Sequence, residues 1–164
     1  MDSRHRIARR LAADRRGNLI IEFALALPIL FLLLVGLLDL GRFSLEKSAM
    51  LQGAREGAQY GIIAYNDSAN INTTAQNATG RTDVTATNNV FCECSSAPGT
   101  SVSCTSTCTG TAVLKRYITV STTAPFSSVL SPATTTFGLN GSKGWLGSWT
   151  PPTSVSASVT MIVP

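Results

Sequence analysis

The sequence predicts an α+β protein, in which a long N-terminal helix precedes a small antiparallel sheet stabilised by disulfides. An apolar run of twenty residues begins at Leu19, and good helix formers continue without proline from Asp39 to Tyr65. Three later stretches alternate apolar and polar residues, as half-buried strands do. Four cysteines lie within or between the first two of these stretches.

The apolar run predicts a transmembrane helix over residues 18–40. From Leu19 to Leu38 its one charge is Glu22. A helix rises about 1.5 Å per residue, so this run matches the roughly 30 Å hydrocarbon core of a bilayer. Pro28 removes one helical hydrogen bond and predicts a bend.

Positive charge is confined to the segment before the apolar run. Residues 1–17 hold six arginines and two aspartates, whereas the rest of the chain has equal numbers of basic and acidic residues. The distribution argues against nucleic-acid binding, which needs a basic face elsewhere. Basic residues beside an apolar helix stay in the cytoplasm, which predicts an N-in, C-out topology. The segment is interpreted either as a solvated basic tail or as a leader that is removed.

The helix is expected to continue over residues 41–65 beyond the membrane. Small residues recur there at every fourth position, namely Ala49, Gly53, Gly57 and Gly61. Such a stripe lets another backbone approach closely. It would pack either against the protein's own sheet or against helices of other subunits, and the sequence favours neither.

Residues 66–164 are predicted to form a small β-rich head. A polar stretch over 66–80 allows one short helix, with Asp67 or Ser68 as the N-cap and Gly80 as the stop, and a loop is the alternative. Strands are expected at 82–94, 113–123 and 154–163. The first two flank a cysteine-bearing loop, and the last two flank a proline-containing insertion at 124–152.

The cysteines Cys92, Cys94, Cys104 and Cys108 are predicted to form two disulfides in an exported head. A zinc site is the rival, but Cys92 and Cys94 are closer than paired zinc ligands usually are. A hairpin folding near Gly99 favours nested pairs, Cys92 with Cys108 and Cys94 with Cys104. Crossed pairing remains open.

Trp145 and Trp149 lie four residues apart in the 124–152 insertion. They would fill the thin core of the head or form an exposed contact site for other subunits, and core filling is favoured. No nucleophile with a base partner, nucleotide loop or metal-ligand cluster other than the cysteines is visible. We therefore expect no enzymatic activity, no cofactor and no metal.

The edge of the apolar run carries a resemblance to a known family. Gly17 is followed by Asn18 and, four residues after Asn18, by Glu22 and Phe23, after a basic leader and at the start of a long apolar helix. This resembles the type IV prepilin cleavage signature. The run RRGNLIIEFALALPILFLLLVGLLDLGR, followed by GAREGAQYG, is similar to the TadE-like minor pilins of the tight-adherence (Tad/Flp) pilus system. The expected helix with a small head also has the geometry of a pilin.

The resemblance implies that residues 1–17 are a prepilin leader, which a prepilin peptidase removes after Gly17. It implies a minor pilin or pseudopilin that acts in pilus assembly for adhesion, with other Tad pilins and the inner-membrane assembly platform as partners. The location would be the bacterial inner membrane or the pilus, within a hetero-oligomer. The alternative is an uncleaved single-pass membrane protein whose periplasmic head binds a partner or ligand.

The position of Glu22 can also be interpreted without the resemblance. A carboxylate inside an apolar segment costs about 2.5–3.5 kcal/mol near a bilayer centre, and less at the edge, so it usually marks a function. Cleavage after Gly17 would create an amine on Asn18 one helical turn away, on this chain or a neighbour. The plainer interpretation is an acid that snorkels to the interface.

Overall fold

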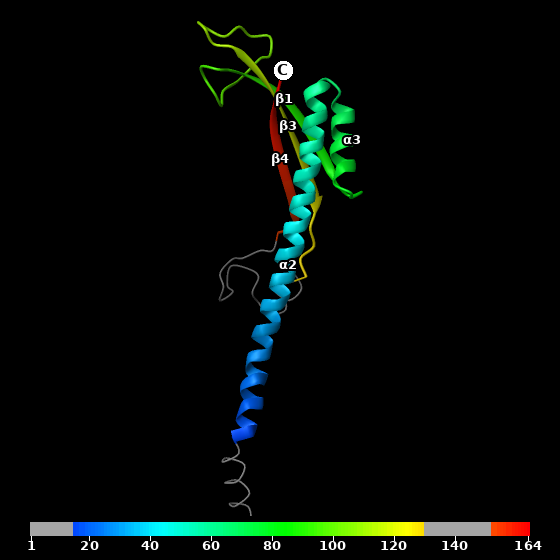
Figure 1. Ribbon diagram of the computed structural model, residues 1–164, viewed down its shortest axis with the longest axis vertical. Helices are drawn as coiled ribbons and strands as arrows, with labels where there is room; N and C mark the ends of the chain where they lie inside the picture. The colour runs from blue at the N-terminus through cyan, green and yellow to red at the C-terminus, as the bar shows by residue number, and fades with distance from the viewer. Residues whose placement is uncertain (1–14, 130–151) are drawn as a thin grey trace, which may run out of the picture. The chain divides into compact units, whose positions relative to one another are not determined.

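The computed structural model describes residues 15–129 and 152–164, with side chains from residue 19 onward. Two helices come first, α2 at Arg15–Ile63 and α3 at Ser68–Ala78 (Figure 1). Four strands follow: β1 at Thr85–Cys94, β2 at Ser101–Val102, β3 at Leu114–Pro125 and β4 at Ser154–Val163. A long N-terminal helix, a small antiparallel sheet and two disulfides confirm the predicted α+β class.

The chain divides into two compact units between Leu40 and Gly41. We call residues 1–40 the N-terminal unit and residues 41–164 the C-terminal unit. In the N-terminal unit, the described residues form the first part of α2. The C-terminal unit holds the remainder of α2, α3 and the whole sheet.

Helix α2 differs from its predicted bounds at both ends. It begins at Arg15, where the sequence had suggested residue 18, and it ends at Ile63, two residues earlier than expected. The end is a tight turn, in which the N–H of Ala64 donates to the carbonyl of Tyr60 and the N–H of Asp67 donates to the carbonyl of Ala64. This turn leads directly into α3.

Helix α3 forms where the polar stretch allowed one. Asp67 is its N-cap, and its carboxylate accepts a hydrogen bond from the backbone N–H of Asn70 at 3.2 Å. Gly80 follows the helix with a φ of 69°, a left-handed conformation that glycine adopts without strain. Ile71 and Ala75 form its buried face, one turn apart. The predicted cap and stop are both confirmed.

The sheet has the order β2-β1-β3-β4, with every neighbouring pair antiparallel. β4 has its predicted bounds, whereas β1 begins three residues later than expected and β3 runs on to Pro125. The two-residue strand β2 was not predicted, because it lies inside the Ser/Gly-rich loop and has no alternation of its own. β4 forms one edge of the sheet.

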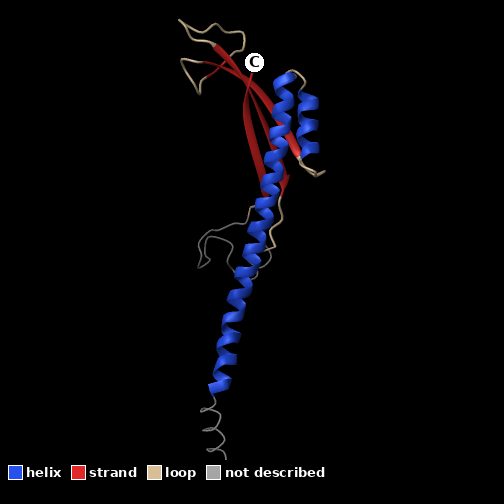
Figure 2. Ribbon diagram, viewed as in Figure 1, coloured by secondary structure: helices blue, strands red, loops and turns tan. Residues whose placement is uncertain are grey.

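One face of the sheet packs against the helices of the C-terminal unit. Buried positions alternate along β1, β3 and β4, and they meet α2 and α3 in two apolar clusters. Figure 2 shows both helices beside the sheet. The larger cluster contains Ala58, Ile71, Ala75, Ala86, Ile118, Val120 and Val163. The second contains Met50, Val84, Ala124, Val155 and Ala157, with Phe43, Ala49 and Leu51 packed against it. The core is therefore made mainly of small and β-branched side chains.

Candidate functional site

The predicted processing junction lies in the first turns of α2. Gly17 and Asn18 are both helical, and the structure describes only their backbone. Glu22 follows Asn18 by about one helical turn, because an α-helix has 3.6 residues per turn. Both Glu22 and Phe23 are exposed in the isolated chain. The junction therefore combines a small residue, an acid one turn further on and the start of an apolar surface.

The apolar surface of the N-terminal unit is largely exposed among the residues that the structure describes. Large apolar side chains point outward on all sides of the helix; among them are Leu19, Ile20, Phe23, Leu25, Ile29, Phe31 and Leu33, each at least 60% exposed. The most apolar window of α2 has none of its residues buried, and among the described residues α2 is the one helix long and apolar enough to cross a membrane. A helix that is apolar all round is typical of a membrane span.

The small-residue stripe packs inside the protein. A Cβ atom added to Gly57 would lie 2.7 Å from the Cβ of Ala75 and 3.1 Å from the Cγ1 of Val120. Gly53 closely approaches Thr79 and Ala75, and Gly61 approaches Ile118. Ala49 is partly buried against the second cluster. Of the two interpretations of the stripe, packing against the protein's own α3 and sheet is therefore the one that holds for the three glycines.

The four cysteines form two disulfides, Cys92 with Cys104 and Cys94 with Cys108. The expected disulfides are thus present, but the nested pairing that the sequence favoured is wrong. The hairpin includes Gly99, as expected, because the N–H of Ala97 donates to the carbonyl of Cys94 and the N–H of Thr100 donates to the carbonyl of Ala97, but the register of β1 and β2 is centred on Ala97. In the resulting register Cys92 lies opposite Val102, so Cys104 reaches Cys92 two residues further on. The chain then turns back and Cys108 reaches Cys94.

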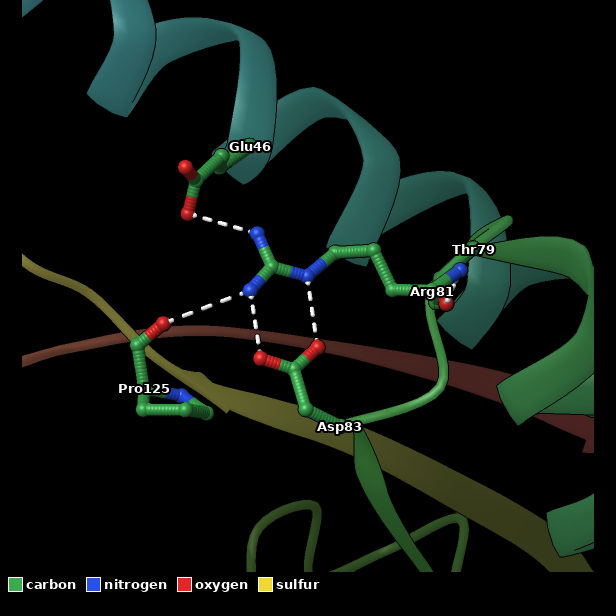
Figure 3. A network of polar contacts seen from close by, with 5 residues as sticks. All are labelled: Glu46, Thr79, Arg81, Asp83 and Pro125. Carbon is green, nitrogen blue, oxygen red and sulfur yellow. Dashed lines mark hydrogen bonds and ion pairs between the residues drawn. The ribbon is translucent and has the colours of Figure 1, made fainter.

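A polar network in the C-terminal unit centres on Arg81, which follows α3 (Figure 3). Its Nε and Nη2 donate to the two carboxylate oxygens of Asp83 at 2.9 and 2.7 Å, and its Nη1 lies 2.9 Å from Oε2 of Glu46 on α2. Nη2 also donates to the carbonyl of Pro125 at the end of β3. One guanidinium therefore joins α2, the approach to β1 and the end of β3. Sequence analysis missed it because Asp83 is near Arg81 in the chain but Glu46 and Pro125 are far from it.

Two carboxylates and one guanidinium of this unit have pKa values shifted from those of free side chains. The hydrogen bond from Arg81, followed by its positive charge, lowers the pKa of Asp83. The side-chain amide of Asn70, and then its backbone N–H, lower the pKa of Asp67. Asp83 in turn raises the pKa of Arg81, chiefly through the same hydrogen bond. All three groups hold their charged forms more firmly than free side chains do.

The face of the sheet opposite the helices was also missed by sequence analysis. Phe91, Tyr117 and Ile162 occupy one register row across β1, β3 and β4, and the rings of Phe91 and Tyr117 stack with centroids 5.5 Å apart. In the next row the hydroxyls of Thr119 and Thr160 lie 2.7 Å apart. This face combines a short apolar row with hydroxyl-bearing side chains.

Other predicted site residues fall outside this description. Trp145 and Trp149 lie beyond the residues that the structure describes. Within residues 15–129 and 152–164, no group of three or more His, Cys, Asp or Glu side chains could hold a metal ion. The described candidates are therefore the junction, the exposed apolar helix and the disulfide-linked loops.

Residues 17–59 match the family model described as TadE-like protein, which confirms the predicted resemblance over this stretch. The match begins at the Gly17 side of the junction and lies wholly within α2. The matched stretch includes the apolar part of α2, which is long and apolar enough to cross a membrane. No curated protein and no solved structure matches the chain.

Proposed function

We propose, from the premise that residues 17–59 carry TadE-like sequence, that the protein is a minor pilin or pseudopilin of a Tad/Flp pilus. A prepilin peptidase cleaves it after Gly17, and the mature chain, which begins at Asn18, takes part in assembly by priming the filament, capping its tip or joining its shaft. It has no enzymatic activity of its own. Its bacterial host uses the pilus for adhesion.

One observation carries the proposal: the family match starts at the residue where the predicted cut falls, and an exposed apolar helix follows at once. A peptidase that cuts there would leave the entire matched segment on the mature chain apart from Gly17. The helix would then begin with a new amine beside lipid. A simple membrane anchor needs the apolar run but has no use for Gly17, Glu22 and Phe23 at this spacing.

Glu22 would pair with the amine that cleavage creates. The acid is costly in an apolar segment unless it has a partner, because an ionised group loses its hydration there. The amine of Asn18, on this chain or on a neighbouring subunit, offers a partner of opposite charge one helical turn away. Cleavage would therefore switch Glu22 from an unpaired acid to an assembly contact.

The packing of α2 indicates which part of it would contact other pilins. Gly53, Gly57 and Gly61 are already occupied by Thr79, Ala75, Val120 and Ile118. The exposed apolar side chains before residue 40 have no such cover. Subunits would therefore pack through this earlier part of α2, in the membrane with the assembly platform and afterwards in the filament. The C-terminal unit would remain on the periplasmic or extracellular side.

The test compares two substitutions in cells that make the pilus. Gly17→Leu should block cleavage, so that the protein keeps its leader and pili are lost. Glu22→Gln should leave cleavage intact but reduce the protein in the sheared pilus fraction. Gly41→Ala, at a helical position with no atom within 4 Å of the added Cβ, is the matched control and should behave as wild type.

The alternative function makes the opposite prediction. An uncleaved single-pass protein whose outer domain binds a partner would show one unchanged size in wild type and Gly17→Leu. Piliation would also be unchanged in both variants. That result would overturn the proposal.

A further inference from the structure

The two disulfides cross each other along the chain. Cys94 lies inside the loop that Cys92 and Cys104 close, and Cys104 lies inside the loop that Cys94 and Cys108 close. Neither bridge joins cysteines that are neighbours in sequence order. Pairing the cysteines in that order would instead join Cys92 with Cys94 and Cys104 with Cys108, and both of those bridges would be wrong.

Chain statistics favour one of these wrong bridges. Cys104 and Cys108 are four residues apart, whereas the two native bridges span sequence separations of 12 and 14. The probability that a flexible loop closes falls as about the three-halves power of its length, so Cys104–Cys108 should form about fivefold more readily than Cys92–Cys104 in the unfolded chain. No strand includes Cys104 or Cys108 to hold them apart.

A wrong disulfide would be difficult to rearrange once the C-terminal unit has folded. Cys92 is fully buried, and β1 is paired there on both sides, with Arg116 of β3 and Val102 of β2. Thiol–disulfide exchange requires a thiolate to reach the sulfur that it attacks. In addition, Cys92 and Cys94 lie two residues apart on one strand, so their Cβ atoms lie on the same face about 6.6 Å apart at the usual rise, which exceeds the roughly 3.5–4.5 Å between Cβ atoms that a relaxed bridge needs. Correction must therefore come before the sheet closes.

We propose that this chain is a substrate of a thiol–disulfide isomerase, a dithiol enzyme that rearranges its bridges before the C-terminal unit closes. The recognised chemistry is a disulfide within the exposed loops between β1 and β3, held in an unfolded or partly folded chain. This partner is distinct from the peptidase and the pilins of the proposed function, and the proposal stands whether or not Gly17 is cleaved.

The exchange balances without net oxidation or reduction. The enzyme's thiolate attacks the sulfur of Cys108 in the Cys104–Cys108 bridge, forms a mixed disulfide and releases the Cys104 thiolate. That thiolate attacks Cys92 in the Cys92–Cys94 bridge, forms Cys92–Cys104 and releases the Cys94 thiolate. Cys94 then attacks Cys108 in the mixed disulfide, forms Cys94–Cys108 and returns the enzyme's thiolate.

The test refolds the full chain in detergent micelles. The reduced, urea-unfolded protein is returned to native buffer with oxidised glutathione, with or without purified protein disulfide isomerase. Pairing is mapped over time by electron-transfer fragmentation of the quenched protein. Without the enzyme, Cys104–Cys108 should exceed Cys92–Cys104 about fivefold among the first one-bridge species. With it, the crossed pair should accumulate several-fold faster.

Two matched variants separate rearrangement from simple oxidation. The double substitutions Cys92→Ala with Cys104→Ala and Cys94→Ala with Cys108→Ala each leave one possible internal bridge. In each variant the enzyme should speed formation of the remaining bridge only as far as it speeds oxidation of the two thiols. Crossed pairing that forms equally fast and completely without enzyme would overturn the proposal. So would an equal gain in the two-cysteine variants, or a final nested pairing.

Discussion

Three glycines set how closely α2 approaches the rest of the C-terminal unit. At Gly57 the space for a side chain is taken by Ala75, Ile71 and Val120, and at Gly61 it is taken by Ile118. Glycine is a poor helix former, costing about 1 kcal/mol relative to alanine. Its presence at four-residue spacing in α2 is explained by close packing, because any larger residue would separate helix and sheet.

We predict that Gly57→Val lowers the free energy of unfolding by about 1–3 kcal/mol, the usual cost of overpacking a filled core. Thermal unfolding of the full chain in detergent, followed by circular dichroism, measures it. Gly41→Val is the matched control in the same helix, because nothing lies within 4 Å of its Cβ. Equal melting temperatures for the two variants would show that Gly57 is not a packing contact.

The ion pair of Arg81 and Asp83 predicts a dependence of stability on acid pH. Arg81 lowers the pKa of Asp83 in the folded state. A carboxylate with a lowered folded pKa stabilises the fold at pH values above its unfolded pKa, about 3.9. That stabilisation is lost as the pH falls through the folded pKa. The melting temperature should therefore fall as the pH drops below about 4, partly through this pair.

Substitution of either partner should reduce that dependence. Asp83→Asn and Arg81→Gln should each give a flatter plot of melting temperature against pH between neutral pH and pH 2.5. The double variant should be no flatter than Asp83→Asn alone, because the two residues act on one interaction. An unchanged acid slope in Asp83→Asn would mean that the pair does not contribute.

Among the elements, β1 and its following loops depend most on covalent links. β2 has two residues and pairs only with Cys92 and Glu93, so hydrogen bonds alone hold it weakly. Both disulfides join the end of β1 to the loop that follows β2. They therefore stabilise the part of the sheet furthest from the second apolar cluster.

We predict that Cys94→Ser with Cys108→Ser costs about 2–4 kcal/mol of stability, the usual value for a loop of this size. Amide hydrogen exchange should become faster in residues 95–113. In β3 and β4 the order of protection should stay as it is, because the pairing between these two strands contains neither cysteine of the removed bridge. Uniform loss of protection across the whole sheet would contradict a local role for this disulfide.

At the scale of the whole molecule, the C-terminal unit, residues 41–164, contains the main stabilising contacts that the structure describes. Both apolar clusters, the Arg81 network and both disulfides belong to this unit. The described part of the N-terminal unit instead presents apolar side chains that need lipid or other helices. The two units are therefore stabilised differently. The C-terminal unit has its own packed core and disulfides, whereas the N-terminal unit needs lipid or other helices around it.

We predict that a fragment of residues 41–164 folds in water without detergent. Its melting temperature should lie within a few degrees of that of the full chain in micelles, since the fragment keeps both apolar clusters and both disulfides. Gel filtration and circular dichroism test this, with the fragment carrying Gly57→Val as a destabilised comparison. A fragment that is unfolded would show that the span is needed for the head.

Much of this architecture could be predicted from local sequence. The apolar run, the cap at Asp67 and the alternation of residues 154–163 each depend on neighbours in the chain, and the structure has all three. The disulfide pairing could not be predicted, because it depends on the register of β1 and β2 and on the path of the loop that follows β2, which no local pattern marks. The Arg81 network joins residues up to 44 positions apart, and no local pattern marks such contacts.

The candidate site residues likewise include some that local sequence marks and others whose role only the fold reveals. Gly17, Asn18, Glu22 and Phe23 form a local signature, and the TadE-like match over residues 17–59 begins there. The role of the glycine stripe needed the position of α3, which a helical repeat does not reveal. Small residues at four-residue spacing fit internal and external partners equally well.

The central claim is that the mature protein begins at Asn18. The direct measurement is N-terminal sequencing, with intact mass, of the protein extracted from membranes of cells that contain an active prepilin peptidase. The account predicts a chain that starts Asn-Leu-Ile-Ile-Glu and lacks residues 1–17. A chain that still carries residues 1–17 in those cells would contradict it and leave a tethered membrane protein.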